Sequence, residues 1–251
     1  MSGMIRLVDI HKSFGKQKVL DGLNLDIEDG KTTVIIGRSG GGKSVLLKHV
    51  IGLLKPDSGQ VLIDDVDMTK LNERDLNEIR KRFGMLFQEA ALFDSMTVGE
   101  NVAFPLREHT KMTEKEIRQI VSDRLRSVGL TGVEEKMPSE LSGGMKKRVG
   151  LARAIALRPE IVLFDEPTTG LDPVMTEAIN QLIMDTQKNF NLTCIVISHD
   201  IESIFRIGHR IAMLYEGKII EYGTPEVIRT STDPVLVQFL SGSINGPIMI
   251  L

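Results

Sequence analysis

Short apolar runs alternate with amphipathic stretches along most of the chain, and the spacing of their apolar residues separates predicted strands from predicted helices. Residues 5–10 and 23–27 predict strands, with Asp21-Gly22 among the turn residues between them. Helical periodicity prevails from about residue 98 to residue 157, with an interruption near residues 129–138. The chain therefore begins with strands and has a helical middle.

The remaining strands are apolar at nearly every position, which is typical of parallel strands covered on both faces. Strands are predicted at residues 32–36, 161–164 and 193–198, helices at residues 44–54, 173–190 and 200–207, and a hairpin around Glu216-Gly217. This alternation predicts an α/β fold with a mostly parallel central sheet. The early strands then form an antiparallel β subdomain, and residues of about 89–158 form an α-helical subdomain. We expect one domain over residues 1–251, with a tail of about 241–251.

Composition narrows the function classes. The formal net charge of −3 gives no overall basic field for nucleic acid. The one cysteine, Cys194, lies in an apolar run and is predicted to be buried. We expect no signal peptide, and there is no uninterrupted apolar stretch of about 18 residues, so a membrane role would depend on a partner.

A glycine-rich segment between a predicted strand and a predicted helix carries the strongest chemical signal. It fits the pattern G-x-x-x-x-G-K-[ST] and consists of Gly37, Arg38, Ser39, Gly40, Gly41, Gly42, Lys43 and Ser44. Glycines let successive backbone N–H groups surround a phosphate, and the helix that follows directs its positive end at the same anion. We expect Lys43 to reach the β- and γ-phosphates of ATP and Ser44 to bind Mg²⁺.

Acidic residues follow the apolar run at residues 161–164. Ligands of open α/β sheets bind beyond the carboxyl ends of the strands, so Asp165 is placed to hold the Mg²⁺ shell. Glu166 is placed to accept a proton from attacking water. His199 follows another predicted strand, at residues 193–198, and is a candidate contact for the γ-phosphate.

A second helix start offers a second anion site. Ser142 is a candidate N-cap, and Gly143 and Gly144 leave backbone N–H groups open at the beginning of a predicted helix. The two anion sites either converge within one chain, or two chains hold nucleotide between them.

The order GRSGGGKS, Gln88, LSGGM, IVLFDEP and His199 resembles the ABC transporter ATPases over essentially the whole chain. The resemblance implies a head-to-tail homodimer in which Ser142 and Gly144 complete the phosphate-loop site of the partner. It implies that Gln88 senses nucleotide and helps to order Mg²⁺ or water. It further implies that Phe14 stacks on adenine and that Asp172 lies in the loop that meets the other subunit.

Three positions depart from the family pattern. Met145 replaces the usual Gln of the LSGGQ signature, Val45 replaces a second hydroxyl residue, and Arg38 replaces a common Pro. Val45 keeps only its backbone N–H for the α-phosphate, so we expect weaker binding there rather than none.

A narrower resemblance links the chain to ATPases of phospholipid-trafficking systems that work with MCE-domain proteins, also called Mla-type or toluene-tolerance systems. It is carried by residues 92–98 and 100–109, by LSGGM followed by KKRV, and by QFLSG at residues 238–242. It implies a motor subunit that works with an integral-membrane permease, an MCE-domain protein and an accessory regulator, at the cytoplasmic face of the bacterial inner membrane.

Other interpretations remain open. A small-solute importer of the amino-acid type shares the ATPase motifs; some carry an added regulatory domain after the hairpin, for which we expect no room here. DNA-repair ABC ATPases need long heptad-patterned arms, and none is present. The basic runs at residues 80–82 and 146–148 are predicted to be solvated helix faces rather than nucleic-acid sites.

Two apolar segments suggest protein partners. Residues 90–93 with Met96 follow Gln88 and resemble the region where these ATPases grip the permease. The tail at residues 243–251 ends in four apolar residues, and we expect it to dock on a neighbouring subunit or an accessory protein.

Overall fold

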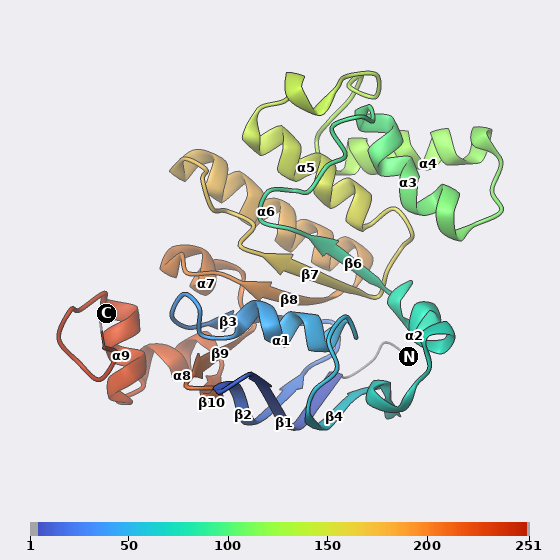
Figure 1. Ribbon diagram of the computed structural model, residues 1–251. Helices are drawn as coiled ribbons and strands as arrows, with labels where there is room; N and C mark the ends of the chain where they lie inside the picture. Colours follow the sequence, from blue (N-terminus) through green and yellow to red (C-terminus); the bar gives the residue numbers. More distant parts are fainter. Residues whose placement is uncertain (1–4, 250–251) are drawn as a thin grey trace. The chain divides into compact units, whose positions relative to one another are not determined.

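The computed structural model describes residues 5–249, which form two compact units (Figure 1). The first unit combines the chain through Asn72 with the chain from Val196 onward, and the second unit is Glu73–Ile195. Among the described residues, no helix has both the length and the apolar character required to cross a membrane.

The first unit contains an antiparallel sheet with the strand order β2-β1-β4-β5. Its strands are β1 (Ile5–Phe14), β2 (Gln17–Ile27), β4 (Ser58–Ile63) and β5 (Val66–Asp67). The side chains of Ile5, Leu7 and Ile27 are almost fully buried, whereas Val8 of the same sheet is 36% exposed. This alternation is typical of a sheet with one face on the core, and the predicted antiparallel subdomain is confirmed.

Both early strands are longer than predicted, and the expected turn at Asp21-Gly22 is wrong, because both residues lie inside β2. The cause is irregular pairing between β1 and β2. The register shifts between Leu7 and Ile10, where Asp9 has a φ of 50°, and Gly22 has a φ of 78°. Such bulges reset the alternation of side chains while pairing continues, so a pattern of period two appears to stop.

The rest of the first unit is built around parallel strands. The strand β3 (Thr32–Ile36) pairs in parallel with β9 (Arg210–Tyr215), which pairs antiparallel with β10 (Lys218–Gly223). The predicted hairpin is confirmed, since Glu216 and Gly217 have φ values of 45° and 78°. The helices are α1 (Lys43–Val50), η1 (Met68–Lys70), α7 (Ile201–Ile207), α8 (Pro225–Thr230) and α9 (Pro234–Ser241).

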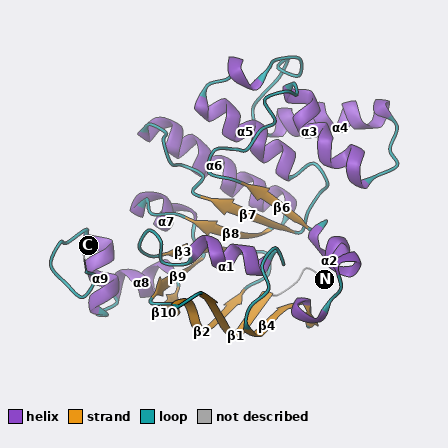
Figure 2. Cartoon of the chain, viewed as in Figure 1, coloured by secondary structure: helices purple, strands orange, loops and turns teal. Residues whose placement is uncertain are grey.

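In the second unit, β6 (Phe83–Leu86) and β7 (Ile161–Asp165) pair in parallel, and β8 (Thr193–Ile197) begins there (Figure 2). The helices are α2 (Glu73–Arg80), α3 (Val98–His109), α4 (Glu114–Ser127), η2 (Pro138–Glu140), α5 (Gly143–Ala154) and α6 (Pro173–Phe190). The predicted α/β class is confirmed: parallel strand pairs, a separate antiparallel sheet and many helices.

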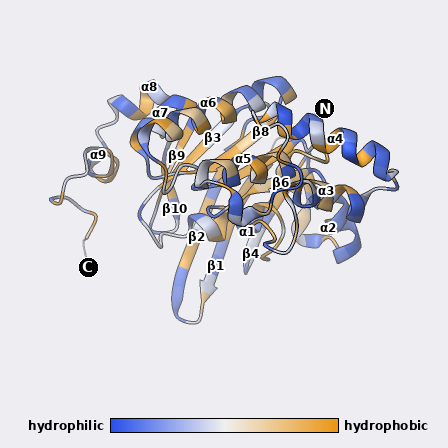
Figure 3. Ribbon diagram, turned by 90° about the horizontal axis from the view of Figure 1, so that it is seen from above, coloured by the Kyte–Doolittle hydropathy of each residue, from blue (hydrophilic) through white to orange (hydrophobic). Residues whose placement is uncertain are grey.

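The helices α3 and α4 begin at capping boxes. Thr97 and Glu100 exchange bonds at the start of α3, and Thr113 and Glu116 do so at the start of α4. The apolar side of α4 is buried, while Figure 3 shows the helix as largely hydrophilic. The amphipathic pattern and the capping residues therefore both account for the helices in the middle of the chain.

The C-terminal tail folds back on its own unit as far as it is described. The side-chain amide of Gln238 donates to the carbonyls of Ser243 and Ile248 at 3.2 Å each, and its oxygen accepts the Ile248 N–H at 2.6 Å. Ile244 and Met249 remain 75% and 78% exposed. The last two apolar residues of the tail, 250 and 251, lie outside the described residues.

Candidate functional site

The phosphate loop of the first unit follows β3, whose five residues are all buried, and leads into α1. Gly37 has a φ of 146°, and a Cβ there would lie 2.3 Å from the Leu214 carbonyl oxygen of β9. Gly42 has a φ of 97° and forms the N-cap of α1 without any side-chain cap. Both glycines are therefore required by backbone geometry, and α1 begins without a side-chain cap, as expected for a helix N-terminus that binds an anion.

Lys43 is held inside this loop before any phosphate arrives. Its ammonium donates to the carbonyl oxygens of Gly37 at 2.7 Å and Arg38 at 2.9 Å, and the residue is 8% exposed. The hydroxyl residue Ser44 is exposed next to it, and Val45 is half-buried. The arrangement presents one fixed cation and one hydroxyl at a helix N-terminus.

Two further predicted site residues belong to the first unit. Phe14 ends β1 with 49% of its surface exposed, and the Lys12 ammonium lies 5.7 Å from the centre of its ring. Lys12 is in turn paired with Asp57 at 2.7 Å. His199 is exposed and precedes Asp200, which caps α7. Because about half of its surface is exposed, the Phe14 ring is accessible for stacking on a base.

In the second unit, parallel pairing places three predicted residues at one edge of the sheet. Leu86 of β6 lies opposite Phe164 of β7. Gln88 follows the first strand, whereas Asp165 and Glu166 end or follow the second. Since carboxyl ends of parallel strands share an edge, these three oxygen-bearing side chains belong to the same part of the unit.

The backbone at Glu166 is strained. Its φ is 51°, in the left-handed region that L-residues rarely adopt. Its carboxylate accepts a bond from the Thr169 hydroxyl at 3.2 Å, and its carbonyl accepts one from the Lys147 ammonium at 3.3 Å. Strain of this kind is concentrated at functional sites, where surrounding contacts hold it.

Lys147 corrects one prediction, because the basic run at residues 146–148 is not simply solvated. Lys147 is only 6% exposed, and burial lowers the pKa of its ammonium, with Glu89 and Glu166 acting in the opposite direction. The signal that was missed is periodicity: Lys147 lies three residues after buried Gly144 and four before buried Leu151. The other basic run, at residues 80–82, carries ion pairs to Glu73, Glu78 and Glu160.

The start of α5 has the predicted cap. The Ser142 hydroxyl accepts the Met145 N–H at 3.3 Å, Gly143 is exposed, and Gly144 is buried. A Cβ at Gly144 would lie 2.2 Å from the Met175 methyl group of α6, so a larger residue there would require the flexible Met175 side chain to move. Asp172 caps α6 by accepting the N–H groups of Val174 and Met175 at 3.0 Å each. The second unit thus presents a second exposed helix N-terminus.

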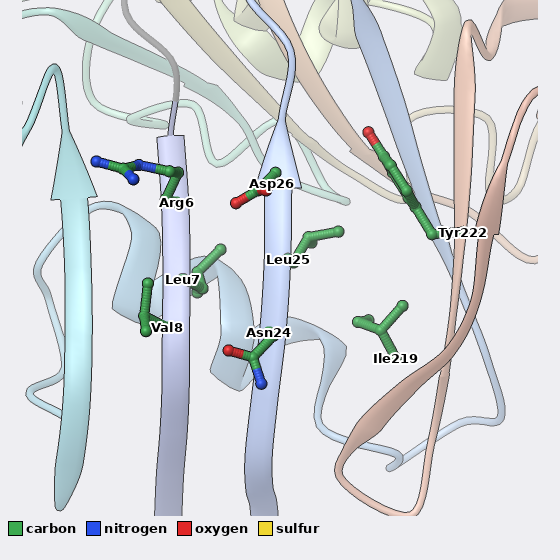
Figure 4. Close-up of a pocket in the computed structure, with 8 residues that line it drawn as sticks. All are labelled: Arg6, Leu7, Val8, Asn24, Leu25, Asp26, Ile219 and Tyr222. Carbon is green, nitrogen blue, oxygen red and sulfur yellow. The ribbon is translucent and has the colours of Figure 1, made fainter.

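Each unit therefore gathers its own share of the predicted residues. Those of the first unit are Phe14, Gly37, Arg38, Ser39, Gly40, Gly41, Gly42, Lys43, Ser44, Val45 and His199. Those of the second unit are Gln88, Ser142, Gly143, Gly144, Asp165, Glu166 and Asp172. A pocket of about 450 Å³ in the first unit lies among β1, β2 and β10 and is lined by none of these residues; Arg6, Asn24 and Tyr222 are among its lining (Figure 4).

Comparisons with known proteins agree with this geometry. The family model described as ABC transporter matches residues 20–169. The MlaF protein of Haemophilus influenzae, an intermembrane phospholipid transport system ATP-binding protein, is 48% identical over 93% of this chain and 89% of its own length. Its namesake in Escherichia coli K12 is 38% identical over 99% of this chain and 92% of its own. A probable ribonucleotide transport ATP-binding protein of Mycobacterium leprae is 47% identical over 99% of this chain and 72% of its own.

Solved structures lead to the same family. The dimer of MJ0796, a bacterial ABC transporter cassette by its description, aligns with a TM-score of 0.81 and 34% identity over 88% of this chain and 98% of that chain. A structure of the same cassette bound to ADP and Pi aligns with a TM-score of 0.80. By these matches, the chain belongs to the ABC transporter family as an ATPase of the Mla-type subgroup.

Proposed function

We propose that this chain is the ATP-hydrolysing motor of a transporter that moves phospholipid or a related hydrophobic substrate. The observation that carries the proposal is identity along nearly the whole chain with proteins named for intermembrane phospholipid transport. The assignment of the chain as a motor and the assignment of its cargo can be tested separately, because the cargo does not contact the nucleotide.

In this proposal, ATP is bound through the phosphate loop, Phe14 and a bound Mg²⁺. Lys43 gives up its two carbonyl partners to bind the β- and γ-phosphates, and Phe14 stacks on adenine. Ser44, Asp165 and Gln88 supply oxygen ligands, the type that Mg²⁺ prefers. When bound, the ion neutralises charge on the phosphates.

Hydrolysis is assigned to residues at the strand ends. Glu166 accepts a proton from the attacking water. Its strained backbone, whose carbonyl accepts a bond from Lys147, fixes the point from which the side chain extends. His199 contacts the γ-phosphate. Hydrogen-bond donors held in place around the phosphates stabilise the charge of the transition state. Such stabilisation is the main source of catalysis in phosphoryl transfer.

Two copies are proposed to complete each other's sites. Ser142, Gly143 and Gly144 then meet the γ-phosphate held by the partner, with Asp172 in the loop that faces it. The exposed N-terminus of α5 at Ser142 and Gly143 supports this role, as does the solved dimer of a similar cassette. The alternative, convergence within one chain, is tested by the subunit mixture described in the Discussion.

A groove in the second unit is proposed to bind the permease. It has a volume of about 410 Å³ and is mainly apolar. Its lining consists of Phe83, Gly84, Met85, Phe87, Ala91, Phe93, Phe104, Pro105, Arg153, Ala154 and Leu157. Phe87 and Phe93 are 40% and 42% exposed, and the rings of Phe93 and Phe104 lie 4.9 Å apart. Aromatic anchors around an apolar hollow suit a short amphipathic helix from an integral-membrane partner.

This docking places the chain at the cytoplasmic face of the bacterial inner membrane. An MCE-domain protein and an accessory regulator complete the proposed assembly, together with the permease. The helical subdomain of about residues 89–158 carries most of the groove, and the tail from about residue 241 is proposed to contact a neighbouring subunit or the regulator through exposed Ile244 and Met249.

A small polar solute is the second candidate cargo, because the Mycobacterium leprae relative is named for ribonucleotide transport. Affinity purification of the membrane complex, followed by identification of its subunits and mass spectrometry of bound lipid, separates the candidates. Recovery of a permease, an MCE-domain protein and phospholipid supports the lipid motor. A permease with a periplasmic solute-binding protein, and no phospholipid, would favour a small-solute importer and leave the ATPase assignment intact.

A further inference from the structure

Three cations of the signature helix α5 each bond to the backbone of a different loop. Lys147 donates to the Glu166 carbonyl, and Arg148 donates to the Val128 carbonyl at 2.7 Å. Arg153 differs from both because it binds two consecutive carbonyls, those of Ala90 at 2.7 Å and Ala91 at 2.8 Å. The planar fork of a guanidinium can fix two acceptors at once, which a lysine cannot do.

The loop that Arg153 holds is strained. Ala90 and Ala91 have φ values of 59° and 47°, so two successive non-glycine residues are left-handed. Each such conformation is disfavoured for L-residues by roughly 5- to 30-fold. The bend begins two residues after Gln88, and the Ala90 N–H closes it by donating to the Phe87 carbonyl at 2.9 Å. Arg153 thus satisfies the carbonyls of a bend that the local sequence does not favour.

Close packing ties the same helix to the same bend. Gly150 lies one turn before Arg153, and a Cβ added there would be 2.7 Å from the Leu86 side chain and 3.1 Å from the Ala90 methyl group. Ala90 is fully buried. The absence of a side chain at Gly150 therefore lets α5 approach the bend, where Arg153 then binds.

Arg153 is also part of the groove wall. It lines the apolar groove of the second unit, and its guanidinium lies 5.9 Å from the centre of the Phe93 ring. The helix runs from Gly143 to Ala154, about 18 Å at the rise of an α-helix. One end of this rigid element lies at the groove, and the other presents the anion site at Ser142.

We propose that Arg153 is a positioning residue that makes the bend after Gln88 and the signature helix move as one body. A segment bound in the groove then displaces Gln88 and the Ser142 end of α5 together. This inference rests on the proposed permease docking, and it names the side chain that transmits the effect of docking to Gln88 and α5. The effect is on coupling, since Arg153 touches backbone rather than nucleotide.

The test compares two arginines of α5 in the complete permease complex. Arg153→Gln removes the bond to the bend, and the matched control Arg148→Gln removes an arginine–carbonyl bond of the same helix elsewhere. The measured quantity is the ratio of ATP turnover with permease to turnover of the chain alone, with the melting temperature recorded for each variant. We expect Arg153→Gln to lower the ratio by roughly 2- to 30-fold, the range of coupling residues, and Arg148→Gln to leave it unchanged.

Two further variants test the geometry. Arg153→Lys keeps the charge and one bond, so it should retain part of the ratio. Adding Ala91→Gly to Arg153→Gln should restore part of it, because Ala91 is exposed and glycine adopts a left-handed φ without penalty. A ratio in Arg153→Gln equal to that of the wild type would overturn the inference. So would a fall that merely follows the melting temperature in both glutamine variants.

A failure of the proposed function gives a different result. If the wild-type chain recovers no permease, the docking proposal is wrong, and the inference is then decided on the chain alone by hydrogen exchange of residues 87–93. Exchange at least about tenfold faster in Arg153→Gln than in Arg148→Gln supports the positioning role. Equal exchange in the two variants refutes it.

Discussion

Replacing His49 by leucine is expected to stabilise the chain, and more strongly at acidic pH. His49 belongs to α1 and is 1% exposed. Its Nδ1 lies 2.7 Å from the Val45 carbonyl oxygen, so this nitrogen carries the proton of the neutral ring. The other nitrogen, Nε2, is buried and has no hydrogen-bond partner among the described residues. Leucine fills a similar space without a polar atom.

The magnitude follows from two terms. An unsatisfied buried polar atom costs about 1–3 kcal/mol, and a typical hydrogen bond contributes about 0.5–1.5 kcal/mol, so the leucine variant gains about 1 kcal/mol at pH 7.5. Burial is the largest cause of the lowered pKa of His49, aided by Lys12 and opposed by the Val45 bond and Asp57. The unfolded chain therefore takes up the proton first as pH falls.

The sign of the pH effect is fixed by this order. With a folded pKa below the ordinary value of 6.5, the stability contributed by neutral His49 is present above pH 6.5 and is lost as the pH falls below it. At pH 5.5, one unit below, protonation of the unfolded state costs the native protein at most about 1.4 kcal/mol, the limit for a His49 that stays neutral when folded. For a chain of this size, that corresponds to a melting temperature about 3–6 °C lower.

Calorimetric melting of wild type, His49→Leu and His49→Gln at pH 7.5 and 5.5 measures both terms. The gap between leucine and wild type should widen at the lower pH, by at most about 3–6 °C. The glutamine side chain cannot titrate, so the gap in melting temperature between the leucine and glutamine variants should be the same at both pH values. The glutamine variant should also lack the stability that leucine gains from apolar burial. A gap of the same size at both pH values would refute the titration argument, and a leucine variant less stable than wild type at pH 7.5 would refute the argument from the unpaired nitrogen.

Three further predictions concern the proposed function. Glu166→Gln should leave ATP binding intact and lower turnover by at least about a hundredfold, the usual effect of losing a general base; normal turnover in a single-turnover assay would remove Glu166 from the chemistry. Lys43→Ala and Ser142→Ala subunits, each inactive alone, should regain about one competent site per mixed dimer because each supplies what the other lacks. If mixed dimers form by light scattering yet stay as inactive as their parents, sites are not shared between chains. Phe93→Asp should strongly reduce recovery of the permease, because it removes an aromatic anchor and places in the groove a carboxylate whose desolvation costs several kcal/mol, while binding of a fluorescent ATP analogue is kept; Leu92→Asp should act in the same direction, and full recovery of the permease with Phe93→Asp would move the docking surface elsewhere.

Features with a local cause could be predicted from the sequence. The strand–loop–helix frame around Gly37 and Lys43, the Ser142 cap and the Glu216-Gly217 hairpin all depend on a few neighbouring residues. The same holds for the helical middle of the chain, where periodicity and capping residues agree.

Features with a long-range cause could not be predicted from the sequence. The bulge at Asp9 arises from pairing between two strands, and it concealed the second half of β1. Burial of Lys147 depends on the carbonyl of Glu166, and the bond from Arg153 to Ala90 joins residues 63 positions apart. No local pattern of charge distinguishes these cations from solvated ones, since their partners are backbone atoms of distant loops.

The burial of Cys194 has a practical consequence. The only thiol of the chain has no exposed surface, so a maleimide dye will not reach it in the folded protein. Cysteines introduced at exposed Lys48 of the first unit and Lys188 of the second would then be the reactive ones, without any background mutation. A donor–acceptor pair on these two positions would report, molecule by molecule, whether the two units change their separation when ATP binds.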